Sequence, residues 1–471
     1  MTLRIFLSTT MAVAAAAIIG ARQPAPQPPQ QPTAQQPPTQ PPPQEPRQPT
    51  ELQLVITGGG GAPPRYAVPD FLALSSDRET VEAAKVIADV LFRDLEFERE
   101  FYLIPRDTYR SVPSATAIDA PPFERWLELG TEGLVLGSVQ RSGAGGLQVR
   151  VRLYNVRTRQ SVLAREYGGT AANPRQYAHT IADEIHQHQR GLRGVARTKL
   201  TFSSDRDGER VRGPIEDRTI QEIYIADYDG ANQRRVTVNR TLNITPVWSP
   251  DGRAIAYTSY RRGFPDVFVS YIYEGRLERP ANGTDRIHNF LPAWSPDGKR
   301  VAFTSNRDGN AEIYAANADG SGIRRLTNHP AIDSTPTWSP TGQQLAFTSD
   351  RSGSPAIYIV GADGLGLRRV TTESYCDRAT WSVAPFNEIA YTCRAGGGYD
   401  IKVFDVGTGV VRQITFGEGS NESPAFAPNG RHLAFTSTRA GRTHIFTIAR
   451  DGRDLRQITH AGNNRFPSWS Q

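Results

Sequence analysis

The sequence lacks the residue patterns that mark the common enzyme sites. It contains no G-x-S-x-G, no H-E-x-x-H, no G-x-G-x-x-G and no Walker motif, which argues against serine hydrolase, zinc peptidase and nucleotide-binding chemistry. It also lacks clustered charge, since 54 Lys and Arg against 48 Asp and Glu leave a net charge of only +6. Because nucleic-acid binding needs a concentrated basic surface, we expect no nucleic-acid partner.

Long hydrophobic runs are absent after the first residues. Arg4 precedes an apolar run from Ile5 to Ile19, which is too short for a comfortable membrane span, and Ala21 is a suitable cleavage position. Residues 1–21 are therefore predicted to be a signal peptide, with an uncleaved anchor as the alternative. We expect the mature protein to be soluble outside the cytoplasm and peripheral to a membrane at most.

The next segments are poor in apolar side chains. Residues 22–50 consist largely of Pro and Gln, so we expect a disordered, extended tether, with a Pro-rich docking peptide as the alternative. Residues 51–61 contain an alternating strand pattern, Glu51-Leu52-Gln53-Leu54-Val55, followed by a Gly-rich joint.

Residues 62–195 mix strand and helix patterns, which predicts a small α/β domain. Strands are expected at Arg65–Phe71, Phe101–Ile104, Gly133–Val139, Leu147–Asn155 and Ser161–Tyr167, and helices at Glu79–Leu95, Phe123–Leu129 and Tyr177–Gln189. Asp77 is placed to cap the first helix. His179 and His186 share the last helix but lack further zinc ligands at suitable spacing, so we expect them on a solvated face.

Residues 196–471 are built from a repeat. An aromatic residue recurs every 43 to 46 residues, at Trp248, Trp294, Trp338, Trp381, Phe426 and Trp469. Each unit reads as four short antiparallel strands, with Pro-Asp-Gly and Asp-Gly sequences at the turns. This period and strand count predict a mainly β fold, a six-bladed β-propeller, preceded by the α/β domain.

The two ends of the repeat indicate how the ring closes. The first unit begins at its second strand, Lys199–Ser204, and the chain stops after an isolated inner strand, Phe466–Gln471. We expect the C-terminal strand to complete the first blade, because closure removes the exposed sheet edges.

Short polar residues precede each aromatic anchor. Up-and-down strand order places the loops before the first strand and after the second at one end of the ring. We interpret these residues as the rim of the channel mouth and as a partner-binding surface, with solvent-facing turns as the alternative: Asn243, Asn289, Asp333, Asp377, Asn421 and Asn464. Arginines recur in nearby turns and are expected to be turn or inter-blade residues, or a ring facing an acidic partner: Arg206, Arg307, Arg351 and Arg439.

The only two cysteines, Cys376 and Cys393, fall on neighbouring strands of one hairpin. An oxidising compartment would let them pair, and two unpaired thiols in a packed sheet are the alternative. No catalytic residue, metal ligand or cofactor site is predicted.

Several motifs together resemble the TolB family of Gram-negative Tol-Pal systems. They are the repeat W-S-P-D-G-x-x-x-A-F-T-S-x-R-x-G-x-x-x-I-Y, the preceding α/β domain, E-L-Q-L-V-I with its Gly-rich joint, R-Y-A-V-P-D-F, and the terminal F-P-S-W-S. The resemblance covers roughly residues 51–471. It implies a non-enzymatic, periplasmic binding module, which is monomeric and has no cofactors.

In that family the propeller binds the peptidoglycan-associated lipoprotein Pal at the channel mouth, and a short N-terminal strand engages the inner-membrane protein TolA. The system maintains the outer membrane and its constriction at division. The resemblance therefore assigns the mouth residues to a Pal-like partner and Glu51 to Val55 to a TolA-like partner. In the family that strand lies at the mature N-terminus, whereas here the tether precedes it.

Two other functions stay open at this point. A secreted propeller enzyme would hold a metal or glycan in the channel and would need several carboxylates or histidines converging there. A scaffold for a different envelope complex would reuse the fold with other partners.

Overall fold

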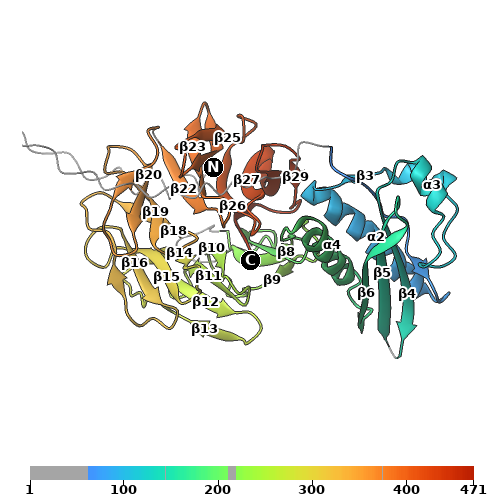
Figure 1. Ribbon diagram of the computed structural model, residues 1–471. Helices are drawn as coiled ribbons and strands as arrows, with labels where there is room; N and C mark the ends of the chain where they lie inside the picture. Colours follow the sequence, from blue (N-terminus) through green and yellow to red (C-terminus); the bar gives the residue numbers. More distant parts are fainter. Residues whose placement is uncertain (1–61, 144, 211–218, 374) are drawn as a thin grey trace, which may run out of the picture. The chain divides into compact units, whose positions relative to one another are not determined.

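The computed structural model describes residues 62–143, 145–210, 219–373 and 375–471 (Figure 1). The predicted signal peptide (1–21), tether (22–50), and N-terminal strand and joint (51–61) lie outside the described residues. Among the helices of the described part, none is long and apolar enough to cross a membrane.

The first part of the described chain contains one sheet with strand order β3-β1-β4-β5-β6, in which β2 also pairs with β4. The strands are β1 (Arg65–Ala67), β2 (Leu72–Ala73), β3 (Tyr102–Leu103), β4 (Gly133–Ser142), β5 (Gly146–Asn155) and β6 (Gln160–Thr170). The single strand expected over Arg65–Phe71 is wrong, since β1 ends at Ala67. Pro69 has no N–H for a ladder, and the Val68 N–H donates to the Tyr109 hydroxyl at 3.1 Å.

The helices of this part are α2 (Arg78–Glu98), α3 (Phe123–Glu128) and α4 (Arg175–Arg190), with a 3₁₀ helix, η1, at Arg106–Ser111. Asp77 caps α2 as predicted, because its carboxylate accepts the Thr80 N–H at 3.0 Å. Helix α4 is capped at its C-terminal end by Gly191, whose φ of 63° is the left-handed conformation that glycine adopts without strain. Helix α2 packs on α4 and β4.

The rest of the chain forms six four-stranded antiparallel sheets, which confirms the predicted six-bladed propeller. The first three blades are β30 (Asn464–Trp469), β7 (Lys199–Ser204), β8 (Glu222–Asp227), β9 (Arg234–Arg235); β10 (Asn243–Trp248), β11 (Ala254–Ser259), β12 (Asp266–Tyr271), β13 (Arg276–Glu278); and β14 (Asn289–Trp294), β15 (Arg300–Ser305), β16 (Glu312–Asn317), β17 (Arg324–Arg325).

The remaining three blades follow in chain order. They are β18 (Asp333–Trp338), β19 (Gln344–Ser349), β20 (Ala356–Gly361), β21 (Arg368–Arg369); β22 (Cys376–Trp381), β23 (Glu388–Ala395), β24 (Gly398–Asp405), β25 (Val411–Gln413); and β26 (Asn421–Phe426), β27 (His432–Ala440), β28 (Arg442–Ala449), β29 (Arg456–Gln457). We call the end at which the inner strands begin the mouth end, and the opposite end the turn end.

The C-terminal strand completes the ring. Strand β30 pairs antiparallel with β7, so the first blade joins the two ends of the propeller. The Trp469 indole N–H donates to the Thr198 hydroxyl at 2.7 Å. Inner strands of successive blades contact one another all the way round, from β30 through β10, β14, β18, β22 and β26 back to β30.

Helices α2 and α4 pack against the turn end of the propeller. A single apolar core cluster includes residues of both helices and of the first and sixth blades, among them Ile185, Tyr228 and Ile445. Around this core Arg431 pairs with Glu98 at 2.6 Å, and Arg175 of α4 pairs with Asp229 of the first blade at 2.5 Å.

The expectation of a solvated face for the two helix histidines is wrong. His179 and His186 are 4% and 0% exposed, because the propeller and α2 cover the helix face on which they lie. His179 Nδ1 lies 2.8 Å from Asp94 of α2, whose other carboxylate oxygen accepts the Tyr228 hydroxyl at 2.7 Å.

Candidate functional site

The structure places the six predicted mouth residues at the mouth end but leaves little of them exposed. Five have no measurable solvent exposure, namely Asn243, Asn289, Asp333, Asn421 and Asn464. The Asp377 side chain is 41% exposed, and its carboxylate accepts the Thr348 hydroxyl of the neighbouring blade at 2.7 Å. Direct contact with a partner is therefore open to Asp377 but not to the other five in this conformation.

The buried asparagines join adjacent blades. The Asn243 carbonyl oxygen accepts the Ser259 hydroxyl of its own blade at 2.7 Å, and its amide donates to Glu222 of the preceding blade at 2.9 Å. Asn289 donates to Asp266 at 2.9 Å in the same way. Asparagine suits the position because one side chain carries both a donor and an acceptor.

Asp333 is the exception in this ring. Arg351 donates to one of its oxygens at 2.7 Å, whereas the other oxygen is buried with no hydrogen-bond partner among the described residues. Burial raises the pKa of Asp333, and the neighbouring Ser349 and Arg351 side chains oppose that rise only partly. The carboxyl group thus takes the place that an amide occupies in four other blades.

The recurring turn arginines are also used inside the propeller. Arg439 donates to the Ser437 hydroxyl at 3.0 Å and to Asn421 at 2.9 Å, and its guanidinium lies 5.3 Å from the Phe446 ring centre. The other members make the same serine contact in their blades: Arg206, Arg307 and Arg351. These arginines hold the mouth end together and do not form a free basic ring.

Each inner strand carries a bulge close to the mouth. The third residue of each strand has a φ of 51° to 58°, an uncommon conformation for a residue other than glycine; these residues are Thr245, Leu291, Thr335, Arg378, Ser423 and Phe466. The threonine of the repeated Ala-aromatic-Thr-Ser strand supports the bulge. Thr258 accepts the Leu291 N–H of the next blade at 3.0 Å, and Thr392 accepts that of Ser423 at 3.0 Å.

Arg378 and Phe466 meet although their strands, β22 and β30, belong to blades on either side of the sixth blade. The guanidinium carbon lies 4.6 Å from the ring centre, within the range of a cation–π contact. The contact therefore joins the inner strands of two blades that are not adjacent.

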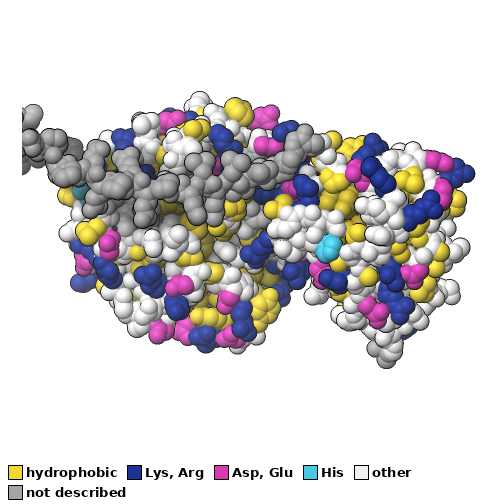
Figure 2. All heavy atoms as spheres, in the orientation of Figure 1, with side chains coloured by type: hydrophobic (Ala, Val, Ile, Leu, Met, Phe, Trp, Pro, Cys, Tyr) yellow, Lys and Arg dark blue, Asp and Glu magenta, His cyan; other side chains and the backbone are white. Residues whose placement is uncertain are grey.

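Exposed apolar side chains lie on the loops that lead into the inner strands. Val238, Tyr375 and Phe416 are 72%, 47% and 73% exposed. Exposed apolar residues within polar loops are typical of protein-binding surfaces. These three residues were not predicted from the sequence, although a single apolar residue within a polar loop is a signal that could have indicated each of them. Lys and Arg are interspersed with Asp and Glu over the face shown in Figure 2.

One cluster in the described part of the chain has the residue types of a metal site, Glu373 with Cys376 and Cys393. The two cysteines are directly paired across β22 and β23 and form a disulfide. Their sulfur atoms are therefore not available as thiolate ligands.

Comparison with known proteins agrees with the two-part fold. Residues 52–162 match the model of the TolB amino-terminal domain, and residues 187–471 match the TolB beta propeller domain. A protein of Bordetella avium named "Tol-Pal system protein TolB" is 34% identical over 423 residues, which cover 89% of this chain and 90% of that protein. A protein of Desulfosudis oleivorans with the same name is 35% identical over 212 residues. That match spans about half of the relative, 46% of its length.

A solved structure supports the same assignment. The crystal structure of TolB from Acinetobacter baumannii superposes with a TM-score of 0.71 at 27% sequence identity, covering 86% of this chain and 96% of that chain. Both the amino-terminal domain and the propeller thus match domains of TolB proteins. The chain belongs to the TolB family.

Proposed function

We propose that this chain is a non-enzymatic, periplasmic interaction module of the Tol-Pal type. Its propeller binds a Pal-like peptidoglycan-associated lipoprotein at the mouth end, and the complex supports outer-membrane integrity and constriction at cell division. The observation that carries the proposal is the match to both TolB domains in one chain, together with 34% identity to a Tol-Pal system protein over 423 residues.

The mouth end supplies a suitable surface. Its loops are anchored by buried amide, serine and arginine contacts, so they are held rigidly and lose little entropy on binding. Val238 and Phe416 offer apolar anchors, and Asp377 offers a half-exposed carboxylate. The buried members of the predicted ring act in this proposal by positioning the loops, not by touching the partner.

The test measures binding of the soluble domain of the Pal-like lipoprotein from the same organism by calorimetry. Val238→Asp and Phe416→Asp each place a charge in the proposed contact and should weaken binding at least tenfold. Leu365→Asp is the matched control, because Leu365 is equally exposed, at 70%, but lies at the turn end between β20 and β21. No binding by the natural chain, or equal losses in all three variants, would refute the proposal.

Residues Glu51 to Val55 are proposed to bind a TolA-like protein as an added strand. Deleting these five residues should abolish capture of the TolA-like domain and leave binding of the Pal-like domain unchanged. Loss of both, or of neither, would contradict this assignment.

A further inference from the structure

One position differs between the blades in a way that opens a pocket at the turn end. It is the first residue of the second strand, which pairs with the last residue of the third strand in every blade. The residues at this position are Lys199, Ala254, Arg300, Gln344, Glu388 and His432. Five of them have long polar side chains, and only Ala254 is small.

The third blade shows what a long side chain does at this position. The Arg300 guanidinium carbon lies 4.7 Å from the ring centre of Trp338 in the next blade, and Trp338 is 6% exposed. The Trp338 indole N–H is also satisfied, since it donates to the Ala293 carbonyl oxygen at 3.3 Å.

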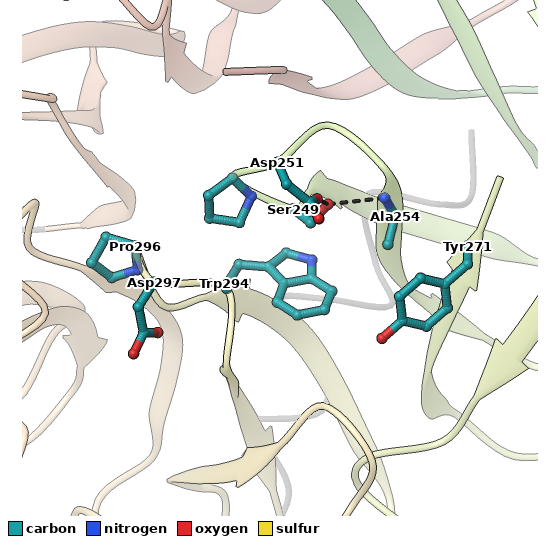
Figure 3. A pocket seen from close by; sticks show the side chains of 9 residues that line it. Ser249, Asp251, Ala254, Tyr271, Trp294, Pro296 and Asp297 are labelled. Atoms are coloured by element: carbon teal, nitrogen blue, oxygen red, sulfur yellow. Dashed lines mark hydrogen bonds between the residues drawn. The ribbon is translucent and has the colours of Figure 1, made fainter. Parts of the chain in front are cut away.

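Beside Ala254 the equivalent tryptophan is left uncovered. Trp294 is only half-buried. Its indole nitrogen is buried and, like that of Trp248, has no hydrogen-bond partner among the described residues. A cavity of about 360 Å³ lies here, at the small end of the range for ligand pockets. In Figure 3 the indole lies between Ala254 and Tyr271 on one side and the Pro296–Asp297 turn on the other.

The charged side chains that line the pocket are both acidic. One oxygen of Asp251 accepts the Ser249 hydroxyl at 2.5 Å and the Arg253 N–H at 3.0 Å, while its other oxygen has no hydrogen-bond partner among the described residues. Asp297 of the next turn also lines the cavity. The Arg276 guanidinium carbon lies 3.6 Å from the ring centre of Tyr271, and Arg276 already pairs with Glu274 and Glu278.

We propose that this pocket is a second protein-binding site, which receives an arginine side chain of a partner between Trp294 and Asp251. The guanidinium would stack on the indole as Arg300 stacks on Trp338, and would donate to the free carboxylate oxygen. The site lies at the end of the propeller opposite to the proposed Pal-like contact and does not depend on it.

The test uses the full chain labelled with [¹⁵N]tryptophan and follows its six indole N–H resonances by NMR. Trp294→Phe assigns the Trp294 resonance. The probe is the peptide acetyl-Gly-Arg-Gly-amide, and its neutral match carries citrulline in place of arginine. The arginine peptide should shift the Trp294 resonance alone, with a Kd in the millimolar range, and the citrulline peptide should bind at least tenfold more weakly.

Two variants sharpen the result. Ala254→Arg rebuilds the arrangement of the third blade and should abolish the shift by filling the pocket from within. Gln344→Arg makes the matched change in the fourth blade and should leave the response intact. Equal shifts with both peptides, a response that survives Ala254→Arg, or tighter binding of N-acetylglucosamine than of the arginine peptide would overturn the proposal. Binding of free agmatine at least tenfold tighter than the peptide would assign the pocket to a small cation instead of a protein.

Discussion

His179 links both helices to the propeller, and its loss should remove a pH dependence of stability. Its Nδ1 lies 2.8 Å from Asp94 of α2, and its Nε2 lies 3.8 Å from Asp227 of the first blade. Burial would lower the pKa of His179, but the nearby carboxyl groups of Asp227 and Asp94 outweigh burial and raise the pKa to about 9 from its ordinary 6.5. The imidazole is therefore protonated in the folded protein at neutral pH.

Asp227 is the ionised partner over this range. Burial acts to raise its pKa, but the nearby His179 ring and the Lys199 ammonium hold the pKa of Asp227 well below the ordinary value. For Asp94 burial prevails over the His179 contact, so the pKa of that carboxyl is raised. Asp227 of the first blade and Asp94 of α2 thus both favour the protonated form of His179.

The pH dependence of the free energy of unfolding follows from the difference between the pKa of His179 in the folded and the unfolded protein. The stabilisation is fully present below pH 6.5 and is lost as pH rises through about 9, because the folded protein then gives up its extra proton. At about 1.4 kcal/mol per unit of pKa difference, the rise from 6.5 to about 9 contributes at most roughly 3 kcal/mol to the free energy of unfolding. The free energy of unfolding of the natural chain should fall by up to that amount across the interval.

Urea unfolding, followed by circular dichroism at pH 6, 7.5 and 9, measures the effect. His179→Gln keeps a neutral polar group and should give a curve that is flatter over this range and lower at pH 6. His188→Gln is the control, because His188 lies on the same helix but is exposed. If His179→Gln loses stability between pH 6 and pH 9 as steeply as the natural chain, then the protonated imidazole between two carboxylates is the wrong picture.

Three other changes test the propeller itself. Replacing Cys376 and Cys393 by Ser removes a cross-link spanning 17 residues and should lower the free energy of unfolding by about 3 kcal/mol, measured against the natural chain with and without reductant. Deleting residues 464–471 removes the inner strand of the first blade and should cause aggregation in light scattering, whereas deleting Gln471 alone should not. Asp333→Asn should raise the melting temperature at pH 8. The pKa of Asp333 is raised in the folded protein, so folding favours its neutral form and stability is lost as pH rises and the carboxyl ionises. A lower melting temperature for Asp333→Asn at pH 8 would contradict the account of that junction.

The sequence by itself determined the architecture. The spacing of Trp248, Trp294 and their equivalents set the number of blades, and the solitary final strand indicated the closure. These features are local, because a blade is a run of consecutive strands whose turns require particular residues. Helix positions in the α/β part were also predictable, since the apolar period and the Asp77 cap are local signals.

The sequence could not determine which side chains are buried by parts of the protein that are distant in the chain. Asn243 and its equivalents look like solvent-facing loop residues, but the neighbouring blade buries them, so they act as structural joints. His179 and His186 look solvated on an isolated helix, but the propeller packs over that face. The small residue Ala254 is plain in the sequence, yet it makes a pocket only because Trp294 of the next blade stands opposite. Only the tertiary structure decides such features, because burial and charge pairing depend on residues far apart in the chain.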